Sequence, residues 1–523
     1  MADDDNGNGN ERKFPTEEIA RLARLSYLDY ELQRAKVAER LGCRKLVLDR
    51  AVLAERAKIE AAEKPVTQAK PKGNGPWPAG QAIAPTEHAI SEAFVGFNTS
   101  ELRYNHTSGD WHIWDGALWR RDERMEAYAR VREFATTVNH PDQGKKKLVD
   151  ALERFARVDQ RMATTHADWD HDPLLLGTPN GTVNLRNGEL TCGRPEDLIS
   201  KSTLVAPSDD DECPIFDDFI NFALNGDAAA IAFLDRYLGY CLTGLTSEEF
   251  LLFMHGREGT GKGTLTKTVM SIMGDYARAV PIEMFTEKNS RHEYYRAVLT
   301  GNRLIVAAEP DRGVSWSEGF VNEATGSDII SGRHPAGRPF EFAPSHKLII
   351  HGNSVPDLKN AASGLKRRLG LMSFPHQPDQ PDVHLKDRLR QEYPAILRRM
   401  INGCLAYQRE GLNVPPGMRA ATDAYFERQN AFKRFLADVT DPETGTHNLL
   451  PGAKMRSGEL LQVYNAWANR NGERRLNSNR LYELIDNDTD AALKNVTGHA
   501  NQRSVEGLAP RPEPDPRQPQ KSD

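Results

Sequence analysis

The chain has 523 residues, of which 39% are hydrophobic and 27% charged. This composition predicts a soluble globular protein with room for about three domains. The formal net charge of −6 excludes a protein coated in nucleic acid, but not one that grips it in a narrow channel. Widely spaced cysteines offer neither a zinc site nor a disulfide framework, and no run reaches membrane-spanning length. These features predict a cytoplasmic protein without a membrane partner.

The first 85 residues predict a helical region followed by a linker. Residues 1–63 carry an acidic lead and then apolar residues at helical spacing, with Gly42 where a helix would end. The segment 34–56 is compatible with a helix-turn-helix, although a plain helical hairpin fits its pattern better. Residues 64–85 are rich in Pro, Gly, Ala and Lys, which is typical of a linker.

Residues 86–245 predict an α+β accessory domain. Trp111 to Trp119 alternate apolar and polar residues around an Asp-Gly turn, and residues 181–190 do so around Asn-Gly, so each segment predicts a hairpin. The tryptophans are expected in the core rather than stacked on bases. Asp168, Asp170 and Asp172 lie close together, but alternating aspartates before a proline favour a loop, and no primase site is expected.

Residues 246–416 contain the strongest motif of the chain, a glycine-rich loop between an apolar strand and a helical segment. Such a loop points its backbone N–H groups at phosphate oxygens, and the following helix adds positive potential. Lys262 would place its charge on the β- and γ-phosphates of ATP. Gly263 stands where this motif usually has Ser or Thr, so Thr264 is a candidate Mg²⁺ ligand. The residues expected to bind ATP are Gly256, Gly259, Thr260, Gly261, Lys262, Gly263 and Thr264.

Hydrolysis also needs a carboxylate near the metal ion, a polar group near the γ-phosphate and a positive charge for the transition state. An apolar run ends at Glu309, the candidate catalytic base and metal ligand, and Asp311 is a weaker candidate. The next apolar run ends at Asn353, which would orient the attacking water. Arg367 and Arg368 follow a loop, and either is a candidate arginine finger that would act on a neighbouring subunit.

Between these two strands, residues 328–342 predict a hairpin. Its apolar arms flank a Gly/Pro turn that carries Arg333, His334 and Arg338. In a ring, copies of this hairpin would line the pore and contact the phosphates of DNA. An ordinary surface hairpin is the alternative.

The C-terminal part predicts a winged-helix-like module over residues 417–509 and a disordered tail over residues 510–523. Leu460, Leu461, Tyr464 and Trp467 share one helical face, residues 481–485 fit a second helix, and residues 495–508 fit a wing. The expected fold class is therefore α/β, with a P-loop AAA+-like ATPase core between an α+β accessory domain and this module.

The order of these motifs resembles the superfamily 3 helicases, in particular the phage and plasmid primase–helicase family with its poxvirus-like relatives. The resemblance rests on residues 233–244, 299–309, 344–356 and 367–375 together with the P-loop, and covers about residues 90–500. It implies an ATP- and Mg²⁺-dependent homo-hexamer that translocates on single-stranded DNA at a replication origin. The family also implies a phage, prophage or plasmid source in a bacterial host, and a separate primase or host replication proteins as partners.

Two other functions remain open at this stage. Residues 259–264 also fit the G-x-G-K-G-T loop of a nucleotide kinase, although such a kinase would leave Asn353 and the arginine pair unexplained. An ATP-switched origin-binding protein would share the same ATPase without processive unwinding.

Overall fold

The computed structural model describes residues 16–23, 36, 37, 40, 52, 86–287, 292–308, 315–333, 339–355, 363–487, 493–497 and 503–511. The chain divides into two units, Met1–Ala84 and Pro85–Asp523. In the first unit, α1 (Thr16–Ala23) lies where the helical pattern begins, and Leu22, Val37 and Val52 are buried. The expected linker lies outside the described residues, as does the expected tail beyond Arg511.

A parallel five-stranded sheet forms the centre of the second unit, with the strand order β14-β8-β13-β10-β9. This is the α/β architecture that the P-loop motif predicted. β13 lies between β8, which precedes the glycine-rich loop, and β10, which precedes Glu309. The strands are β8 (Leu251–His255), β9 (Ala277–Val280), β10 (Leu304–Ala308), β13 (Lys347–Gly352) and β14 (Leu369–Ser373).

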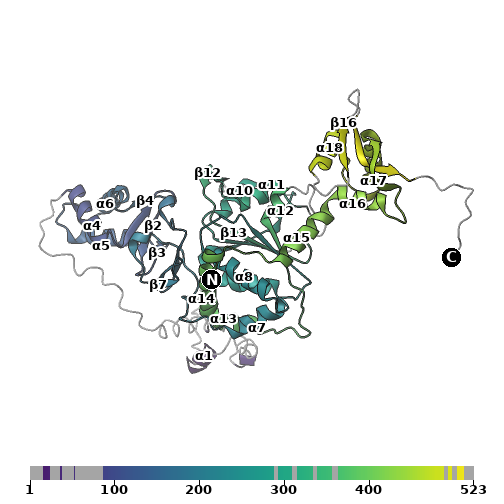
Figure 1. Cartoon of the computed structure of the whole chain (residues 1–523). Coiled ribbons are helices and arrows are strands. Elements are labelled where there is room, and N and C mark those ends of the chain that lie inside the picture. Colours follow the sequence, from purple (N-terminus) through teal and green to yellow (C-terminus); the bar gives the residue numbers. More distant parts are fainter. Residues whose placement is uncertain are drawn as a thin grey trace, which may run out of the picture. The chain divides into compact units, whose positions relative to one another are not determined.

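Helices cover both faces of this sheet, which explains why its strands are continuous apolar runs. Along β8, Leu252 and Met254 join one hydrophobic cluster, whereas Leu251 and Phe253 join the other. Figure 1 shows α8 and α14 on one face of the sheet, with α10, α11 and α12 on the other. The helices are α7 (Pro214–Ala223), α8 (Ala228–Leu242), α9 (Lys262–Met273), α10 (His292–Leu299), α11 (Glu318–Thr325), α12 (Ser363–Arg368), α13 (Leu385–Gln391), α14 (Tyr393–Glu410) and α15 (Pro416–Gln429).

The expected hairpin in residues 328–342 is present beside α10. β11 (Ile330–Arg333) pairs antiparallel with β12 (Pro339–Phe342), so that Arg333 lies opposite Pro339. The turn between these strands lies outside the described residues.

Helices α8 and α14 approach each other closely at two glycines. A Cβ atom at Gly239 would collide with the backbone of Cys404, and one at Gly403 would collide with the carbonyl of Asp235. α8 precedes the domain boundary that we expected at residue 245, yet its apolar side chains share a cluster with the strands of the central sheet.

The region before α7 contains two small sheets. In the first, of order β3-β2-β1-β4, the Trp111 to Trp119 hairpin is present. Trp111 and Trp119 are buried as predicted, whereas Trp114 is only partly buried. In the second, β6 pairs with β7 as the Asn-Gly turn predicted, and Leu176 and Val183 join the cluster under α8 and α14. The elements are α4 (Glu87–Asn98), β1 (Leu102–Asn105), β2 (Asp110–Trp114), β3 (Trp119–Arg121), α5 (Glu126–Thr137), α6 (Lys146–Val158), β4 (Ala163–Thr164), β5 (Leu175–Thr178), β6 (Gly181–Asn184) and β7 (Glu189–Thr191).

The three aspartates of the predicted loop each have an internal partner. Asp168 accepts hydrogen bonds from Thr165, Asp170 accepts two from Ser200, and Asp172 forms an ion pair with Arg186. These contacts account for the three carboxylates as loop-stabilising groups.

The C-terminal part has a hydrophobic cluster of its own. Leu460, Tyr464 and Trp467 are buried in it, as the helical pattern predicted. The expected wing strands pair with each other, and the sheet has the order β15-β17-β16. The elements are α16 (Ala431–Thr440), β15 (His447–Arg456), α17 (Ser457–Asn471), α18 (Ser478–Asn487), β16 (Lys494–Thr497) and β17 (Arg503–Pro510).

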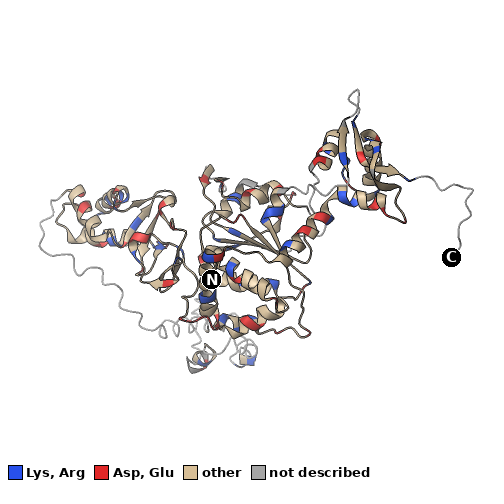
Figure 2. Cartoon of the chain, viewed as in Figure 1, with Lys and Arg blue, Asp and Glu red and all other residues tan. Residues whose placement is uncertain are grey.

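Basic and acidic residues are interspersed along the described helices and strands, as the colours of the ribbon in Figure 2 show. Among the described helices, none combines the length and apolar character that crossing a bilayer requires.

The contact between α8 and α14 yields a stability prediction. We expect Gly239→Ala or Gly403→Ala to destabilise the protein by roughly 3 kcal/mol, because the added methyl group forces two backbones apart. Thermal unfolding followed by circular dichroism measures this. Gly96→Ala on α4 is the control, because a Cβ there meets nothing within 4 Å and alanine favours a helix. A wild-type melting temperature in both core variants would contradict the packing.

Candidate nucleotide site

The glycine-rich loop follows the carboxyl end of β8 and leads into α9. Gly261 caps α9 with a φ of 95°, a left-handed conformation that favours glycine. A Cβ atom at this position would also lie 2.6 Å from Cε2 of Phe219 on α7. Glycine at this position therefore lets the loop pass directly beneath α7 and turn into the helix.

Lys262 is the first residue of α9, and its side chain folds back over the loop. Its Nζ donates hydrogen bonds to the carbonyl oxygens of Gly256 and Arg257, both at 2.7 Å, and to Oγ1 of Thr260 at 3.1 Å. The residue is 6% exposed. An ammonium group held inside a ring of backbone groups is placed to meet a phosphate that enters the loop.

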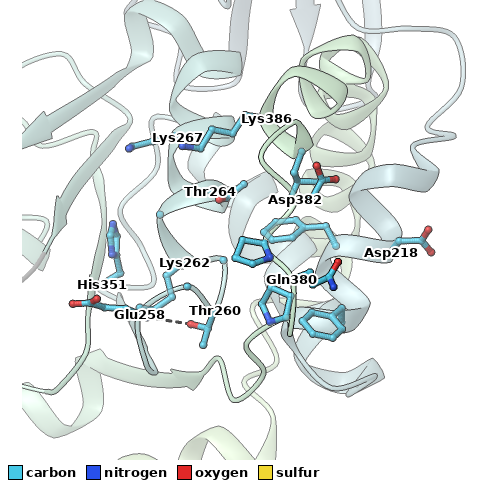
Figure 3. Close-up of a pocket in the computed structure, with 18 of the residues that line it drawn as sticks. Asp218, Glu258, Thr260, Lys262, Thr264, Lys267, His351, Gln380, Asp382 and Lys386 are labelled. Carbon is cyan, nitrogen blue, oxygen red and sulfur yellow. Dashed lines mark hydrogen bonds between the residues drawn. The ribbon is translucent and has the colours of Figure 1, made fainter.

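The loop forms one wall of a cavity of about 670 Å³. The expected ATP-binding residues from Gly259 to Thr264 line it together, and Asn353 reaches the same cavity from the end of β13. Gly256 does not line the cavity and instead accepts a hydrogen bond from Lys262. Figure 3 shows Thr260, Lys262 and Thr264 around the loop, with Glu258 and His351 nearby. A volume of this size is typical of small-molecule sites.

Asn353 is brought to the loop by the pairing of β13 with β8. Gly352 pairs with His255, so the next residue along each strand is Asn353 on one and Gly256 on the other. The Asn353 Nδ2 lies 3.4 Å from Oε1 of Glu258 in the loop. The amide group is thus positioned at the phosphate end of the cavity.

His351 is a residue of this cavity that the sequence reasoning missed. Its Nε2 lies 3.3 Å from Oγ1 of Thr266 on α9, and its ring is the nearest group, at 4.0 Å, to a Cβ built on Gly263. The imidazole therefore lies beside the position from which a serine or threonine would project. Burial and the charges of Lys262 and Lys267 lower the pKa of His351 to about 4. The sequence does contain one sign of this role, because His351 lies two residues before Asn353 on the same apolar strand.

Gly263 itself is not required by the backbone or by crowding. It lies within α9, and a side chain there would make only an ordinary contact with His351. Mg²⁺ takes few protein ligands and keeps much of its water beside substrate phosphates. The Thr264 hydroxyl on the cavity wall fits such an ion. Among the described residues, no group of three or more His, Cys, Asp or Glu is arranged to hold a metal ion.

β10 ends at Ala308, and Glu309 and Asp311 lie outside the described residues. The same holds for His334 and Arg338 of the expected DNA-binding hairpin, of which Arg333 is described and exposed at the end of β11.

The two arginines lie at the opposite end of the sheet from the loop. Leu369, the residue after Arg368, pairs with Leu251 at the amino end of β8, whereas the loop follows the carboxyl end. Strand β8 has five residues, so its two ends lie roughly 13 Å apart at about 3.3 Å per residue. The arginines are thus directed away from the cavity of their own chain.

The environments of the two arginines differ. Arg368 is held by Oε2 of Glu249 at 2.8 Å, by the Asn322 carbonyl at 3.3 Å and by Oγ1 of Thr325 at 3.2 Å, and its side chain is 12% exposed. Arg367 reaches the same carboxylate only at 3.7 Å, and its side chain is 70% exposed.

Comparison with known proteins supports the resemblance drawn from the motifs. Residues 91–225 match the family model described as D5 N terminal like. The chain is also 24% identical over 295 residues to "Putative helicase L207/L206" of Acanthamoeba polyphaga mimivirus, covering 51% of this chain and 31% of that protein. The predicted resemblance to a poxvirus-like helicase family is confirmed.

Two further comparisons complete this relationship. "Putative helicase 022R" of Frog virus 3 is 22% identical over 367 residues, covering 53% of this chain and 37% of that protein. The chain thus spans about a third of the length of each of these viral relatives. The solved C-terminal region of NrS-1 has 10% identity and a TM-score of 0.49, covering 80% of this chain and 98% of that one. A likeness at this level does not establish a shared fold.

The strand that carries His351 also yields a pH prediction. Burial lowers the pKa of His346, which directly precedes β13, to about 4, against about 6.5 in an unfolded chain. The unfolded state therefore binds the proton first, and stability should fall as the pH drops from about 6.5 towards 4, by up to about 1.4 kcal/mol per pH unit.

His346→Gln removes this titration and should flatten the decline of the unfolding free energy with falling pH. Urea unfolding at several pH values between 7 and 4.5 measures the difference between the variant and the wild type. Parallel pH profiles for the two proteins would contradict a neutral buried imidazole.

Proposed function

We propose that the protein is an ATP-dependent DNA helicase of superfamily 3, with an AAA+-like P-loop core that works as a ring motor on single-stranded DNA. One observation carries the proposal. Lys262 and Asn353 converge on a single cavity, while Arg367 is exposed at the far end of the same sheet. The cavity supplies half of an ATPase site, namely a phosphate-binding loop and a polar side chain, Asn353, for the γ-phosphate. The exposed arginine supplies the other half to a neighbouring copy.

This division of the site between two ends of the sheet supports a homo-oligomer, for which we propose a hexameric ring. An arginine that stabilises the transition state must touch the γ-phosphate. Since Arg367 lies at the end of the sheet remote from its own loop, the phosphate that it touches belongs to another subunit. Closed rings are the assemblies in which such a head-to-tail contact is repeated without a free end.

We assign the finger to Arg367 and an anchoring role to Arg368. Arg368 is engaged with Glu249, Asn322 and Thr325, so its guanidinium is committed within the subunit. Arg367 is exposed and only loosely associated with Glu249, which leaves it able to reach outward. Both arginines contact the carboxylate of Glu249. Because Arg368 binds it more closely, Arg367 is left free to contact a neighbouring subunit.

The remaining assignments complete the motor. Glu309 would activate the attacking water, and Thr264 and Glu309 would hold Mg²⁺, which neutralises charge on the phosphates when bound. Arg333, His334 and Arg338 would contact single-stranded DNA in the pore, and the winged-helix-like module would meet origin DNA. The similarity to two viral proteins, each described as a putative helicase, supports the helicase assignment as a whole. The same motor would serve phage, prophage or plasmid replication beside a separate primase or host replication proteins in the bacterial cytoplasm.

The first test is ATP hydrolysis with and without single-stranded DNA, with transfer of phosphate to AMP measured in parallel. We expect DNA to stimulate hydrolysis, and we expect no phosphorylation of AMP. Lys262→Ala should lower turnover by about a hundredfold or more, because it removes the positive charge that contacts the transferred phosphoryl group. DNA-independent activity that phosphorylates AMP would instead identify a nucleotide kinase. Strand displacement on forked DNA then separates a motor from an ATP-switched origin-binding protein.

The arginine assignment predicts different phenotypes for two neighbouring residues. Arg367→Ala should keep the wild-type melting temperature and ATP binding but lose about a thousandfold in turnover, as removal of a finger does. Arg368→Ala should lower the melting temperature, because the largely buried Glu249 contact loses its partner. Calorimetry, nucleotide titration and turnover assays measure the three quantities.

A mixing experiment tests action between subunits. Arg367→Ala and Lys262→Ala are each expected to be inactive alone, but a mixed ring contains interfaces at which an intact loop meets an intact Arg367. Recovery of hydrolysis on mixing supports the assignment. No recovery in verified mixed rings would count against a finger acting in trans.

A further inference from the structure

The cavity beside the glycine-rich loop extends well past the phosphate-binding groups, and its far part is built differently. Near the loop it is lined by backbone, Lys262 and Asn353, whereas the far part lies between α7 and the segment before α13. Figure 3 shows Gln380 and Asp382 beside the loop residues Thr260 and Thr264, with Asp218 of α7 beyond them. The identity of its occupant rests on the proposed nucleotide site.

One wall is aromatic and belongs to α7. Phe219 is 9% exposed and packs so closely on Gly261 that the loop could carry no side chain there. Phe222, one helical turn on, is 47% exposed, and its ring centroid lies 5.8 Å from that of His376. A large aromatic side chain left half exposed at a cavity rim provides a face on which a flat ring can stack.

The opposite wall comes from the segment that follows β14 and from α13. Pro378, Pro381 and Leu385 give it apolar surface, and proline is stiff because its ring fixes φ. The same segment also brings polar side chains to the cavity, those of Gln380, Asp382, Lys386 and Arg388. The two walls together form a slot of aromatic, apolar and polar side chains beside a phosphate-binding loop.

The carboxylate of Glu392 also joins the two walls. Glu392, between α13 and α14, accepts hydrogen bonds from the backbone N–H groups of Ile215 at 3.0 Å and Phe216 at 2.9 Å, at the start of α7. These are N–H groups that a helix N-terminus leaves without partners. The contact fixes α7 against the segment that carries the other wall, so the slot exists before any ligand enters, which lowers the cost of binding.

We propose that this slot holds the base of the nucleotide, which stacks on Phe222 with Phe219 behind it and is covered by Pro381 and Leu385. The phosphates then extend along the loop to Lys262. Stacking on Phe222 favours purines over pyrimidines, because a purine presents the larger ring system. Phe222 is accordingly a specificity-determining residue for the substrate.

The test uses the full-length chain and Phe222→Ala, with binding measured by isothermal titration calorimetry. The ligands are ATP, UTP and inorganic tripolyphosphate, which has the phosphates but no base. We expect the Kd for ATP to rise about tenfold, the preference for ATP over UTP to shrink, and tripolyphosphate binding to stay unchanged. Phe222→Trp should retain ATP binding, because it keeps a stacking face.

A matched control is Phe155→Ala on α6, where a phenylalanine of similar exposure, 42%, is replaced away from the cavity. Unchanged ATP binding and an unchanged ATP-to-UTP preference in Phe222→Ala would overturn the proposal. Equal weakening of ATP and tripolyphosphate would also overturn it, since the effect would then lie at the phosphates. If tripolyphosphate binds too weakly to measure, the ATP-to-UTP preference alone decides.

The same measurements distinguish an error in the proposed base-binding slot from an error in the proposed ATPase function. Loss of ATP binding in Lys262→Ala together with normal binding in Phe222→Ala would leave the ATPase in place and reject only the slot. Normal ATP binding in Lys262→Ala would reject the phosphate loop itself.

Discussion

The parallel arrangement of the five central strands is the constraint on which the rest of the structure depends. Because every strand runs in the same direction, the segments after β8 and β13 meet at one edge, and the segments before β8 and β14 meet at the other. The phosphate loop and Asn353 therefore share a cavity, while Glu249 and the two arginines lie at the far edge. Ligand sites at the carboxyl ends of parallel strands arise from the same geometry in other open sheets.

The sheet is buried on both faces, and that burial is shared with segments from outside the ATPase motifs. The close contact of α8 with α14 depends on glycines that allow backbones to touch. Arg303, 4% exposed just before β10, donates hydrogen bonds to the carbonyls of Leu242 at 2.6 Å and Leu175 at 2.7 Å. One guanidinium thus binds the second small sheet and α8 to the central sheet, so the region that matches the D5 N terminal like model is joined to the ATPase by buried polar contacts.

The elements with the clearest local patterns were predictable. Apolar runs at residues 251–254, 304–308 and 347–352 became buried strands, and the Asp-Gly and Asn-Gly turns became hairpins, because strand burial and turn geometry are decided within a few residues. His351 was not predicted, since a lone histidine in an apolar run gives no local sign of what faces it. Phe219 and Phe222 were not predicted either, since they precede the loop by some forty residues and reach it only because α7 packs against the loop at Gly261.

The sequence by itself determined the order of motifs, the phosphate loop and the resemblance to a helicase family, because these depend on residue types at short spacing along the chain. Only the tertiary structure decided which groups share the cavity, which arginine is committed within the subunit, and that α7 contributes aromatic side chains to the cavity. Those properties arise from contacts between residues far apart in sequence. Their distances are set by strand order and helix packing, which no local pattern records.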